Sequence, residues 1–395
     1  MISETLSART STRLFYALTA VAALVLAVGL GAAYYMEERG HVVTGMTNQV
    51  VWGLPHVFAI FLIVAASGVV NVASIGSVFG KPAYKVRAPL AGLLCLAMLA
   101  GGLMVLMLDL GRPDRLIVAA THYNFTSVFA WNVFLYSGMT AIVAMYLWTL
   151  MERRMNPYAK AAGFAAFVFR LILTTGTGAI FAFLAARQAY GSALLPPLFI
   201  VMSFGWGLAV FLLVQAAMLA WNGLAMPEHV ERRMRRLLGV FVAATLYFVA
   251  AHHLTNAYFA KQLGFEHFIL FDGGAYPALF WLGYVGIGSV VPLALIYAPA
   301  AGPRAALAAS ALVIAGAFCE LYVFIIGGQA YPLELFPGMA VESTFFDGAI
   351  ASYAPSLPEL LLGLGGVAAA LLITAVGARA LEFLPRETPA SAAAD

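Results

Sequence analysis

Ten apolar stretches, each long enough to cross a lipid bilayer, follow one another along this chain of 395 residues. Crossing the hydrocarbon core takes about 20 residues of helix, and no water is available there for a free backbone group. The stretches are continuous and lack the polar–apolar alternation of barrel strands, so they indicate helices. We place them at 14–36, 50–79, 89–109, 126–150, 161–187, 195–224, 237–260, 276–299, 305–330 and 358–381. The sequence therefore predicts an all-α, polytopic membrane protein with about ten transmembrane helices.

The basic residues are distributed unevenly among the connections between these helices. Only 10% of the chain is charged and 63% is hydrophobic, so the position of each charge is informative. Fifteen lysines and arginines fall in the two terminal segments and every second connection, five fall in the alternate connections, and Arg170 lies within a helix. Cytoplasmic loops carry the excess of basic residues, so we expect both termini in the cytoplasm. Residues 1–13 then form a cytoplasmic N-terminus, 14–382 a single membrane domain and 383–395 a disordered cytoplasmic tail.

The cysteine content restricts the redox groups that the chain can carry. Its two cysteines, Cys95 and Cys319, both lie inside apolar stretches. An iron–sulfur cluster takes about four thiolates, and the chain has neither zinc-ligand spacing nor a haem-attachment motif. We therefore expect no covalently bound or side-chain-ligated metal, and we interpret the cysteines as buried structural residues. A haem held by histidines remains the alternative.

Several ionisable residues lie in the apolar stretches at a similar depth. Each costs roughly 2.5–3.5 kcal/mol on insertion scales, which makes it a functional candidate. Each also has a structural alternative: an interfacial histidine, a hydrogen-bonded neutral carboxyl, or an ion pair that closes a loop. His252 and His253 point about 100° apart on a helix, so we expect at most one of them to face a given site. With a rise of 1.5 Å per residue, the group in the outer half of the membrane is His56, Asp109, His252, His253 and Glu320.

The segment LDLGRPDR, residues 108–115, places two arginines on the side that should be poor in them. A quinone suits such a place, because its two carbonyls become hydroxyls on reduction and need proton donors and acceptors. A histidine such as His56 can exchange protons with the headgroup, and a neighbouring carboxylate such as Asp109 can orient its ring and pass on a proton. We expect Arg112 to fold back toward Asp109 and keep it ionised. The last two residues of the segment then serve the loop or a docked partner.

Two longer segments resemble a known family of membrane subunits. GHVVTGMTNQVVWGLPHVFAIFLIVAASGVVNVASIGSVFGK and LDLGRPDRLIVAATHYNFTSVFAWNVFLYSG are similar to the NrfD/polysulfide-reductase membrane-subunit family, of which PsrC-like proteins are members. The likeness is closest to its DsrP branch, the membrane subunits of the DsrMKJOP complex of dissimilatory sulfur metabolism. It extends over about 14–382, and its specific motifs lie within roughly 41–138. For the fold, we expect two four-helix bundles with flanking helices.

The resemblance implies a function and a set of partners. Family members bind menaquinone or ubiquinone near the outer face, hold no cofactor with their own side chains, and exchange electrons with a periplasmic, ferredoxin-like iron–sulfur subunit. That subunit would be DsrO-like and would dock on the outer loops, beside other membrane and cytochrome subunits; nucleic acid plays no part. By position, His56, Asp109 and Arg112 match the family motif. Tyr123, Tyr136, His252 and Glu320 do not come from the motif; we predict them as quinone contacts from their estimated depth in the membrane. Asn71 and Arg170 are candidates for a proton path.

The leading hypothesis is a quinone-interacting membrane subunit of a respiratory redox complex in a bacterial cytoplasmic membrane. It would exchange electrons between the quinone pool and the periplasmic iron–sulfur subunit. A haem b cytochrome is one alternative, with His56, His122, His252 or His253 as axial ligands. A secondary transporter is another, although its helices should be broken near the midplane. The last is a non-catalytic membrane anchor, for which replacing His56 or Asp109 would leave turnover unchanged.

Overall fold

The protein is described by a computed structural model that covers residues 5–6, 12–333, 348–381 and 383–385. Ten helices in these ranges are long and apolar enough to cross a membrane. Seven are regular: α1 (Thr12–Arg39), α2 (Leu54–Ser77), α4 (Ala88–Leu108), α6 (Val128–Met151), α7 (Ala159–Ala182), α8 (Leu195–Trp221) and α9 (Glu228–Tyr258). An eighth is the last helix, α15 (Leu357–Ala380). The other two are composite: α11 (Ala275–Ala278) with η6 (Leu279–Val290) and α12 (Val291–Tyr297), and α13 (Pro303–Leu321) with η7 (Tyr322–Gly327) and α14 (Gly328–Ala330).

Short elements occupy the connections between these spans. They are η2 (His41–Val43), α3 (Pro82–Lys85), η3 (Pro113–Arg115), α5 (Leu116–Thr121), η4 (Arg153–Tyr158), α10 (Ala260–His267) and η5 (Phe268–Asp272). Two strands of two residues each, β1 (Thr5–Leu6) and β2 (Leu384–Pro385), pair antiparallel. The predicted all-α fold with ten spans is confirmed. Several boundaries differ by a few residues. The largest difference is at α9, which begins at Glu228 and not near 237, because its charged first turns are helical and carry two ion pairs four residues apart.

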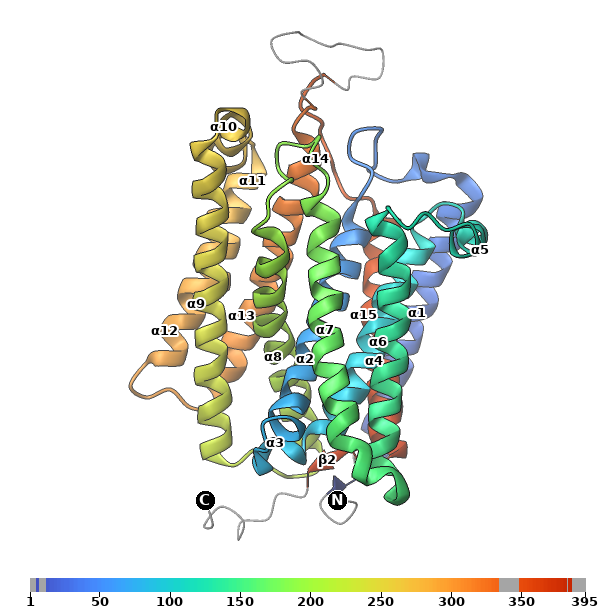
Figure 1. Cartoon of the computed structure of the whole chain (residues 1–395), viewed down its shortest axis with the longest axis vertical. Coiled ribbons are helices and arrows are strands. Elements are labelled where there is room, and N and C mark those ends of the chain that lie inside the picture. Colours follow the sequence, from blue (N-terminus) through green and yellow to red (C-terminus); the bar gives the residue numbers. More distant parts are fainter. Residues whose placement is uncertain (1–4, 7–11, 334–347, 382, 386–395) are drawn as a thin grey trace.

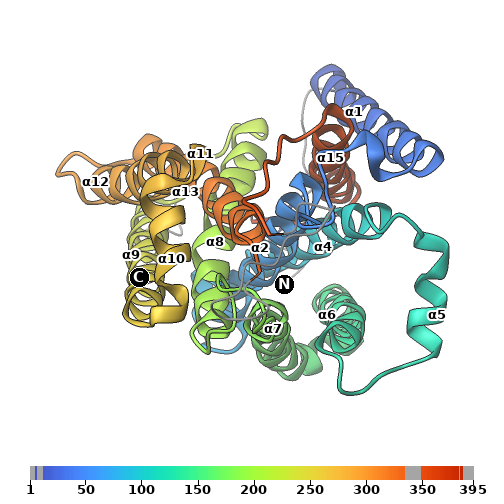
Figure 2. The same cartoon turned by 90° about the horizontal axis from the view of Figure 1, so that it is seen from above.

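The spans form two four-helix groups and a flanking pair, as Figures 1 and 2 show. The first bundle consists of α2, α4, α6 and α7, and the second of α8, α9, the η6–α12 span and α13. α2 and α8 join the bundles at a close backbone approach: a Cβ on Gly207 would lie 2.3 Å from the carbonyl carbon of Gly68. α1 packs against α15, and α15 packs against α4. This arrangement agrees with the expected two bundles plus flanking helices.

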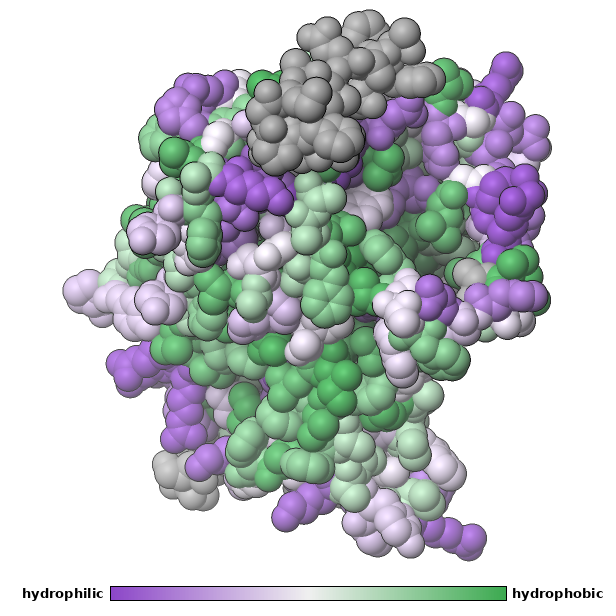
Figure 3. Space-filling model, turned by 45° about the horizontal axis from the view of Figure 1, so that its top comes forward, coloured by the Kyte–Doolittle hydropathy of each residue, from purple (hydrophilic) through white to green (hydrophobic). Residues whose placement is uncertain are grey.

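The two ends of the molecule differ in what they carry. The β1–β2 pair places the first and last described segments at one end, which we call the terminal end. The opposite end, which we call the loop end, carries α5, α10 and the connections that lead into α2 and α15 (Figure 1). The loops expected outside the membrane gather there, while 334–347 and the predicted tail beyond 385 lie outside the described residues. Figure 3 shows apolar residues over the middle of one face and hydrophilic ones toward both ends.

Candidate functional site

The best-defined polar contact in the first bundle joins His56 to Asp109. His56 lies in the first turn of α2, which begins after Gly53 with Pro55 near its start, and Asp109 caps the C-terminus of the neighbouring α4. The two helices are antiparallel, so both residues reach the loop end together. His56 Nδ1 lies 2.7 Å from Asp109 Oδ2; the Asp109 side chain is fully buried and that of His56 is 13% exposed. The structure thus brings together the two residues that the sequence placed at a common depth.

The orientation of His56 relative to Asp109 leaves the Asp109 carboxylate able to accept a hydrogen bond from a further partner. Although 2.7 Å is a hydrogen-bond distance, His56 Nδ1 and the Asp109 oxygens do not meet in a well-aligned hydrogen bond. Within the described part of the chain, neither Asp109 oxygen has another hydrogen-bond partner. A buried carboxylate with unused acceptor capacity is costly unless something else bonds to it. The pair therefore has the features of a site that accepts a proton or a hydroxyl donor.

Trp52 completes this site; it lies within one of the two family-like segments, although it is not among the residues predicted for the site. Its ring stacks on the His56 ring, with centroids 5.8 Å apart and planes 23° apart. The same indole also packs near Phe129 of α6 and Phe181 of α7, with ring centroids 6.2 Å and 5.6 Å away. Stacked aromatic pairs contribute about 0.5–1.5 kcal/mol beyond their buried area. Trp52 therefore fixes one face of the imidazole and provides a flat apolar wall beside it.

An arginine and a glutamine hold the segment that carries Trp52. Arg187, in the α7–α8 connection, donates from Nη1 to the Gln329 carbonyl at 3.0 Å and from Nη2 to the Gln49 carbonyl at 2.8 Å. The Gln329 side chain accepts from the backbone N–H groups of Val51 and Trp52 and donates to the Trp52 carbonyl, each at 3.0 Å. Partial burial lowers the pKa of Arg187 from its ordinary value. One of the few arginines on the predicted outer side therefore has a structural reason to be there.

A carboxylate at the start of α15 fixes the beginning of α2 from the other side. Glu359 forms a capping box with Ser356, and its Oε2 also accepts from the Gly45 N–H at 2.9 Å. Tyr353 donates to Glu359 Oε1 and accepts from the Leu54 N–H, both at 2.7 Å. Burial, followed by the neighbouring carboxylate, raises the pKa of Tyr353 far above its usual range, so it stays a donor. The backbone just before His56 is thus held on two sides.

Arg112 does not contact Asp109, which corrects our expectation. Its guanidinium makes two hydrogen bonds of 3.0 Å to Asp114, and the two side chains are 61% and 59% exposed. This pairing raises the pKa of Arg112 and lowers that of Asp114. The reason is the backbone: Gly111 has a left-handed φ of +72°, which turns the chain outward while Asp109 points into the bundle. The turn also has no room for a side chain at Gly111, because a Cβ there would lie 2.7 Å from the His41 ring.

The two tyrosines proposed from depth lie elsewhere. The Tyr123 hydroxyl donates to the Ala130 carbonyl, and its ring packs on Phe134 with centroids 4.3 Å apart. Tyr136 is buried in the core of the first bundle. The Tyr123 hydroxyl is therefore committed to the start of α6, and in the described part of the chain no hydrogen bond or ring contact joins either tyrosine to His56.

His252 and Glu320 belong to a separate polar cluster in the second bundle. His253 Nδ1 lies 2.7 Å from Glu266 Oε2, while Asn256 bridges Glu266 Oε1 at 2.9 Å and His252 Nε2 at 3.2 Å. Glu266 comes from α10 and the other three from α9. The sequence singled out the histidines but missed Glu266 and Asn256, because a charged residue in a loop segment looks solvated.

This cluster adjoins a small cavity of about 30 Å³, lined by Ala189, Leu198, Val249, His252, His253, Phe265, Ile269, Phe280, Glu320, Val323 and Phe324. Both histidines line it, contrary to our expectation that at most one would face a given site. His252 Nδ1 and Glu320 Oε2 are buried without a hydrogen-bond partner among the described residues. A water needs about 10–15 Å³ of such space, so the cavity has room for about two waters.

Aromatic rings stand between the two clusters. Trp52, stacked on His56, contacts Phe181, and Phe181 contacts Phe324 with centroids 5.0 Å apart. Phe324 in turn lines the cavity of the second cluster. The expectation that His252 and Glu320 share a site with His56 was therefore wrong: helices at the same depth belong here to two different bundles.

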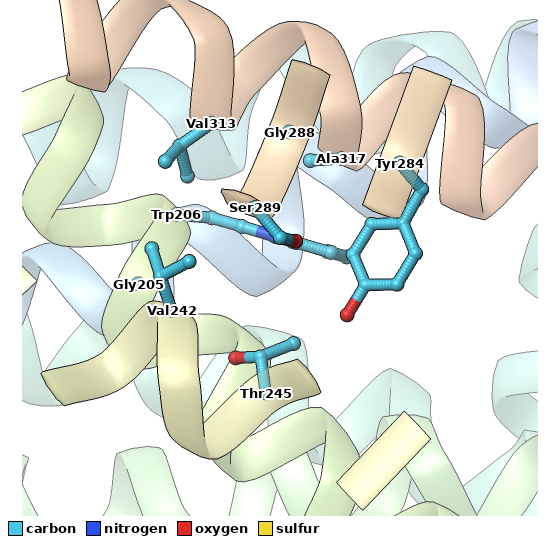
Figure 4. A pocket seen from close by; sticks show the side chains of 9 residues that line it. All are labelled: Gly205, Trp206, Val242, Thr245, Tyr284, Gly288, Ser289, Val313 and Ala317. Carbon is cyan, nitrogen blue, oxygen red and sulfur yellow. The ribbon is translucent and has the colours of Figure 1, made fainter. Parts of the chain in front are cut away.

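A smaller cavity continues the polar region of the second bundle toward the terminal end. It has a volume of about 10 Å³ and is lined by Gly205, Trp206, Val242, Thr245, Tyr284, Gly288, Ser289, Val313 and Ala317 (Figure 4). The Tyr284 hydroxyl has no partner in the described part of the chain. Ala317 lies one turn before Glu320 on α13, so the two cavities are neighbours along this helix.

Arg170 lies at the middle of α7 and is fully buried. Its guanidinium carbon lies 4.5 Å from the centre of the Phe204 ring and 5.4 Å from that of Phe167. None of its side-chain nitrogens, nor Nδ2 of Asn71 on α2, has a hydrogen-bond partner among the described residues. No contact joins Arg170 to Asn71, so their proposed common path stays a prediction. Over the same residues, no group of three or more His, Cys, Asp or Glu side chains could hold a metal ion.

Comparison with known proteins places this arrangement in a family. The sequence profile of polysulphide reductase, NrfD, matches residues 42–332. The chain belongs to the NrfD family. The match covers both bundles of this NrfD protein, and α1 and α15 lie outside it. The predicted family is thereby confirmed.

Three curated relatives cover nearly the whole chain. A protein of Archaeoglobus fulgidus described as an Hdr-like menaquinol oxidoreductase integral membrane subunit is 30% identical over 94% of each chain. A putative dimethyl sulfoxide reductase membrane subunit of Halobacterium salinarum is 29% identical over 95% of this chain and 92% of its own. A selenate reductase subunit of Mesobacillus selenatarsenatis is 22% identical over 90% and 91%. The chain is thus similar throughout to membrane subunits of oxidoreductases.

Proposed function

We propose that this NrfD protein is the quinone-reactive membrane subunit of a respiratory redox complex, with the quinone headgroup bound at the His56–Asp109 pair. The observation that carries the proposal is the 2.7 Å approach of His56 Nδ1 to a fully buried Asp109 carboxylate. The description of one relative as a menaquinol oxidoreductase subunit supports it. Menaquinone or ubiquinone is the proposed substrate.

The residues present fit such a headgroup. Asp109 has unused acceptor capacity, His56 is partly exposed, and Trp52 offers a flat face next to both. Leu110 follows Asp109 in the sequence and Phe129 packs on Trp52, and both side chains are apolar and about half exposed. An isoprenoid tail would lie against them on its way to the lipid.

The chain's part in the reaction is the handling of protons. Oxidation of a bound quinol to the quinone releases two electrons, which pass to the proposed iron–sulfur subunit, and two protons, which His56 accepts and passes on one after the other. His56 Nδ1 faces Asp109, so Nε2 is the ring nitrogen left to accept a proton from a headgroup hydroxyl. The adjacent carboxylate fixes the tautomer and stabilises the charged ring that results. Asp109 can do this without Arg112, which lies in the surface turn.

The proposed partners lie at the loop end. Because the terminal end carries the excess of basic residues, we place it in the cytoplasm of a bacterial cell and the loop end in the periplasm. A ferredoxin-like iron–sulfur subunit, DsrO-like if the complex serves dissimilatory sulfur metabolism, would dock on η3, α5 and α10. Other membrane and cytochrome subunits would complete the complex. The names of the relatives, which include two reductases, support a multi-subunit assembly.

A second role is favoured by the cluster in the second bundle. Glu320 and His252 each present an unpartnered atom, among the described residues, beside a cavity with room for about two waters. Such waters would connect Glu320, near the middle of its span, to His253 and Glu266 at the loop end. We propose that this column takes up or releases protons during turnover.

Binding of a quinol analogue tests the proposed site directly. The purified full chain is titrated with a hydroxyquinoline N-oxide, and quenching of the analogue's fluorescence reports binding. A hydrogen bond to a charged group contributes about 1.5–3 kcal/mol, so Asp109→Asn should weaken Kd by about tenfold or more.

Glu266→Gln provides the matched control, because it breaks the equivalent pair in the second bundle. It should bind the analogue within about twofold of the wild type. Equal binding by Asp109→Asn and the wild type, or loss only in Glu266→Gln, would overturn the assignment.

A further inference from the structure

The first turns of α9 carry four arginines, of which two are neutralised within the helix. Arg232 pairs with Glu228, and Arg235 Nε lies 3.0 Å from Glu231 Oε1, each pair four residues apart. Arg235 is buried and also donates to the Ile296 carbonyl at the end of α12. These two arginines therefore serve the helix and its contact with α12.

The other two arginines face a groove. Among the described residues, neither Arg233 nor Arg236 forms an ion pair with a carboxylate, and both are exposed. Together with Leu237, Val240 and Tyr297 they line a shallow, wide-open groove between α9 and α12, which we call the arginine groove. In Figure 1, α12 leaves the bundle beside the lower half of α9. Two cations without a compensating carboxylate in the described part of the chain thus face a hollow with apolar walls.

The walls of the arginine groove continue into an exposed apolar stripe. Val240, Tyr247 and Leu254 follow Arg233 at intervals of seven residues, and all three are more than half exposed. Seven residues make two helical turns, so these side chains share one face of α9. Tyr297 forms the opposite wall, with its hydroxyl over Gly239, where a Cβ would lie 2.8 Å away. The two cations lie at the end of a membrane span, where a lipid has its headgroup. The apolar stripe continues along the span, where a lipid has its acyl chains.

We propose that the arginine groove binds an anionic phospholipid. The phosphate would bond to Arg233 and Arg236, near the Tyr297 hydroxyl, and one acyl chain would run along the stripe from Val240. Paired guanidinium groups suit phosphate oxygens, and basic pockets between helices at the membrane surface favour anionic headgroups. A free phosphate ion would leave the apolar walls uncovered, which is why the occupant is a lipid. The proposal is independent of the quinone site.

Native mass spectrometry of the full chain tests it. The chain is placed in nanodiscs of equal phosphatidylglycerol and phosphatidylcholine, released into detergent, and the retained lipids are counted. The wild type should retain phosphatidylglycerol preferentially. Each arginine near an anionic surface contributes a few-fold in affinity, so Arg233→Gln with Arg236→Gln should lower this retention by about 30-fold.

Two controls separate the groove from general charge effects. Arg153→Gln with Arg154→Gln removes the same charge from exposed positions at the same end of the molecule and should leave retention unchanged. Tyr297→Ser should weaken retention of both lipids by removing a wall. The proposal fails if the groove variant retains as much phosphatidylglycerol as the wild type, if both double variants lose it equally, or if inorganic phosphate displaces it.

Discussion

Two histidine–carboxylate pairs with the same 2.7 Å separation occupy the two bundles, but their surroundings differ. His56 and Asp109 meet near the loop end beside the exposed apolar residues of α4 and α6, with acceptor capacity left on Asp109. His253 and Glu266 are joined by Asn256 and His252 and adjoin a cavity of about 30 Å³. The chemistry of each pair is similar, so the difference between them lies in the residues that surround each pair.

The backbone around the two pairs differs as well. The first pair lies on regular α-helices, and the segment that leads into α2 is held by hydrogen bonds with Arg187, Gln329 and Glu359. In the part of the chain that the structure describes, the π-helical segments η5, η6 and η7 all lie in or next to the second bundle. Such segments are rare and frequently occur at functional sites. The first pair is thus rigidly placed for a ligand, and the second lies among helices with irregular hydrogen bonding.

The largest expected effect comes from removing the carboxylate of the first pair. Asp109→Asn should lower quinol oxidation by the assembled complex by at least about 100-fold, because general acid–base groups contribute about 10²–10⁴. His56→Ala should do the same. Steady-state turnover with a soluble quinol measures this, and co-purification of the partner subunits verifies assembly. Turnover near the wild-type rate in an assembled Asp109→Asn complex would remove the pair from the reaction.

A smaller effect is expected from the residue that holds the segment before α2. Arg187→Met removes two charge-assisted hydrogen bonds to backbone carbonyls and should cost about 2 kcal/mol of stability. Turnover should fall by about tenfold, since misplacing a catalytic group by about 1 Å can cost 100-fold. Thermal unfolding and turnover are measured together. Unchanged stability and activity would mean that Trp52 and His56 keep their positions without Arg187.

In the second bundle, we expect a substitution to change proton exchange rather than the rate of quinol oxidation. Glu320→Gln keeps the shape of the side chain but cannot exchange a proton, so quinol oxidation should remain within about threefold of wild type. Proton uptake or release per quinol, followed with a pH dye in proteoliposomes, should fall. A variant that loses quinol binding and keeps proton exchange would reverse our assignment of the two clusters.

The smallest effect is expected from Arg112, although the sequence motif points to it. Its partner is Asp114, and such exposed pairs contribute little. Arg112→Ala should therefore keep turnover within about twofold of wild type when the complex is assembled. A loss as large as that of Asp109→Asn would show that the turn rearranges to bring Arg112 to Asp109 in the working complex.

The sequence was sufficient for the architecture and for one pair of residues. Hydrophobic length and charge asymmetry predicted ten spans, and depth along the helices brought His56 level with Asp109. Depth could not tell which bundle a helix joins, so His252 and Glu320 were assigned to the wrong cluster. The lateral position of a helix depends on tertiary contacts, which neither hydropathy nor spacing encodes.

Local backbone geometry and contacts between distant residues account for the other differences between the predicted and the observed sites. The left-handed Gly111 turned Arg112 toward Asp114, and the motif alone does not reveal that direction. Trp52, Gln329 and Glu266 act through contacts between residues far apart in the chain. No periodicity or spacing in the sequence signals such contacts. Arg187 is a basic residue on the predicted outer side, where such residues are rare. That position was the one signal in the sequence for a residue that supports the site without having been predicted for it.

Photolabelling of the intact complex with an azido-quinone tests most directly where the headgroup binds. Our account predicts that the label is found on peptides containing Trp52 and His56 or on those from residues 105–130, and that excess quinone suppresses it. Labelling should be lost in Asp109→Asn and retained in Glu266→Gln. Specific labelling confined to α9 and α10, with none around His56, would contradict the assignment of the quinone to the first bundle.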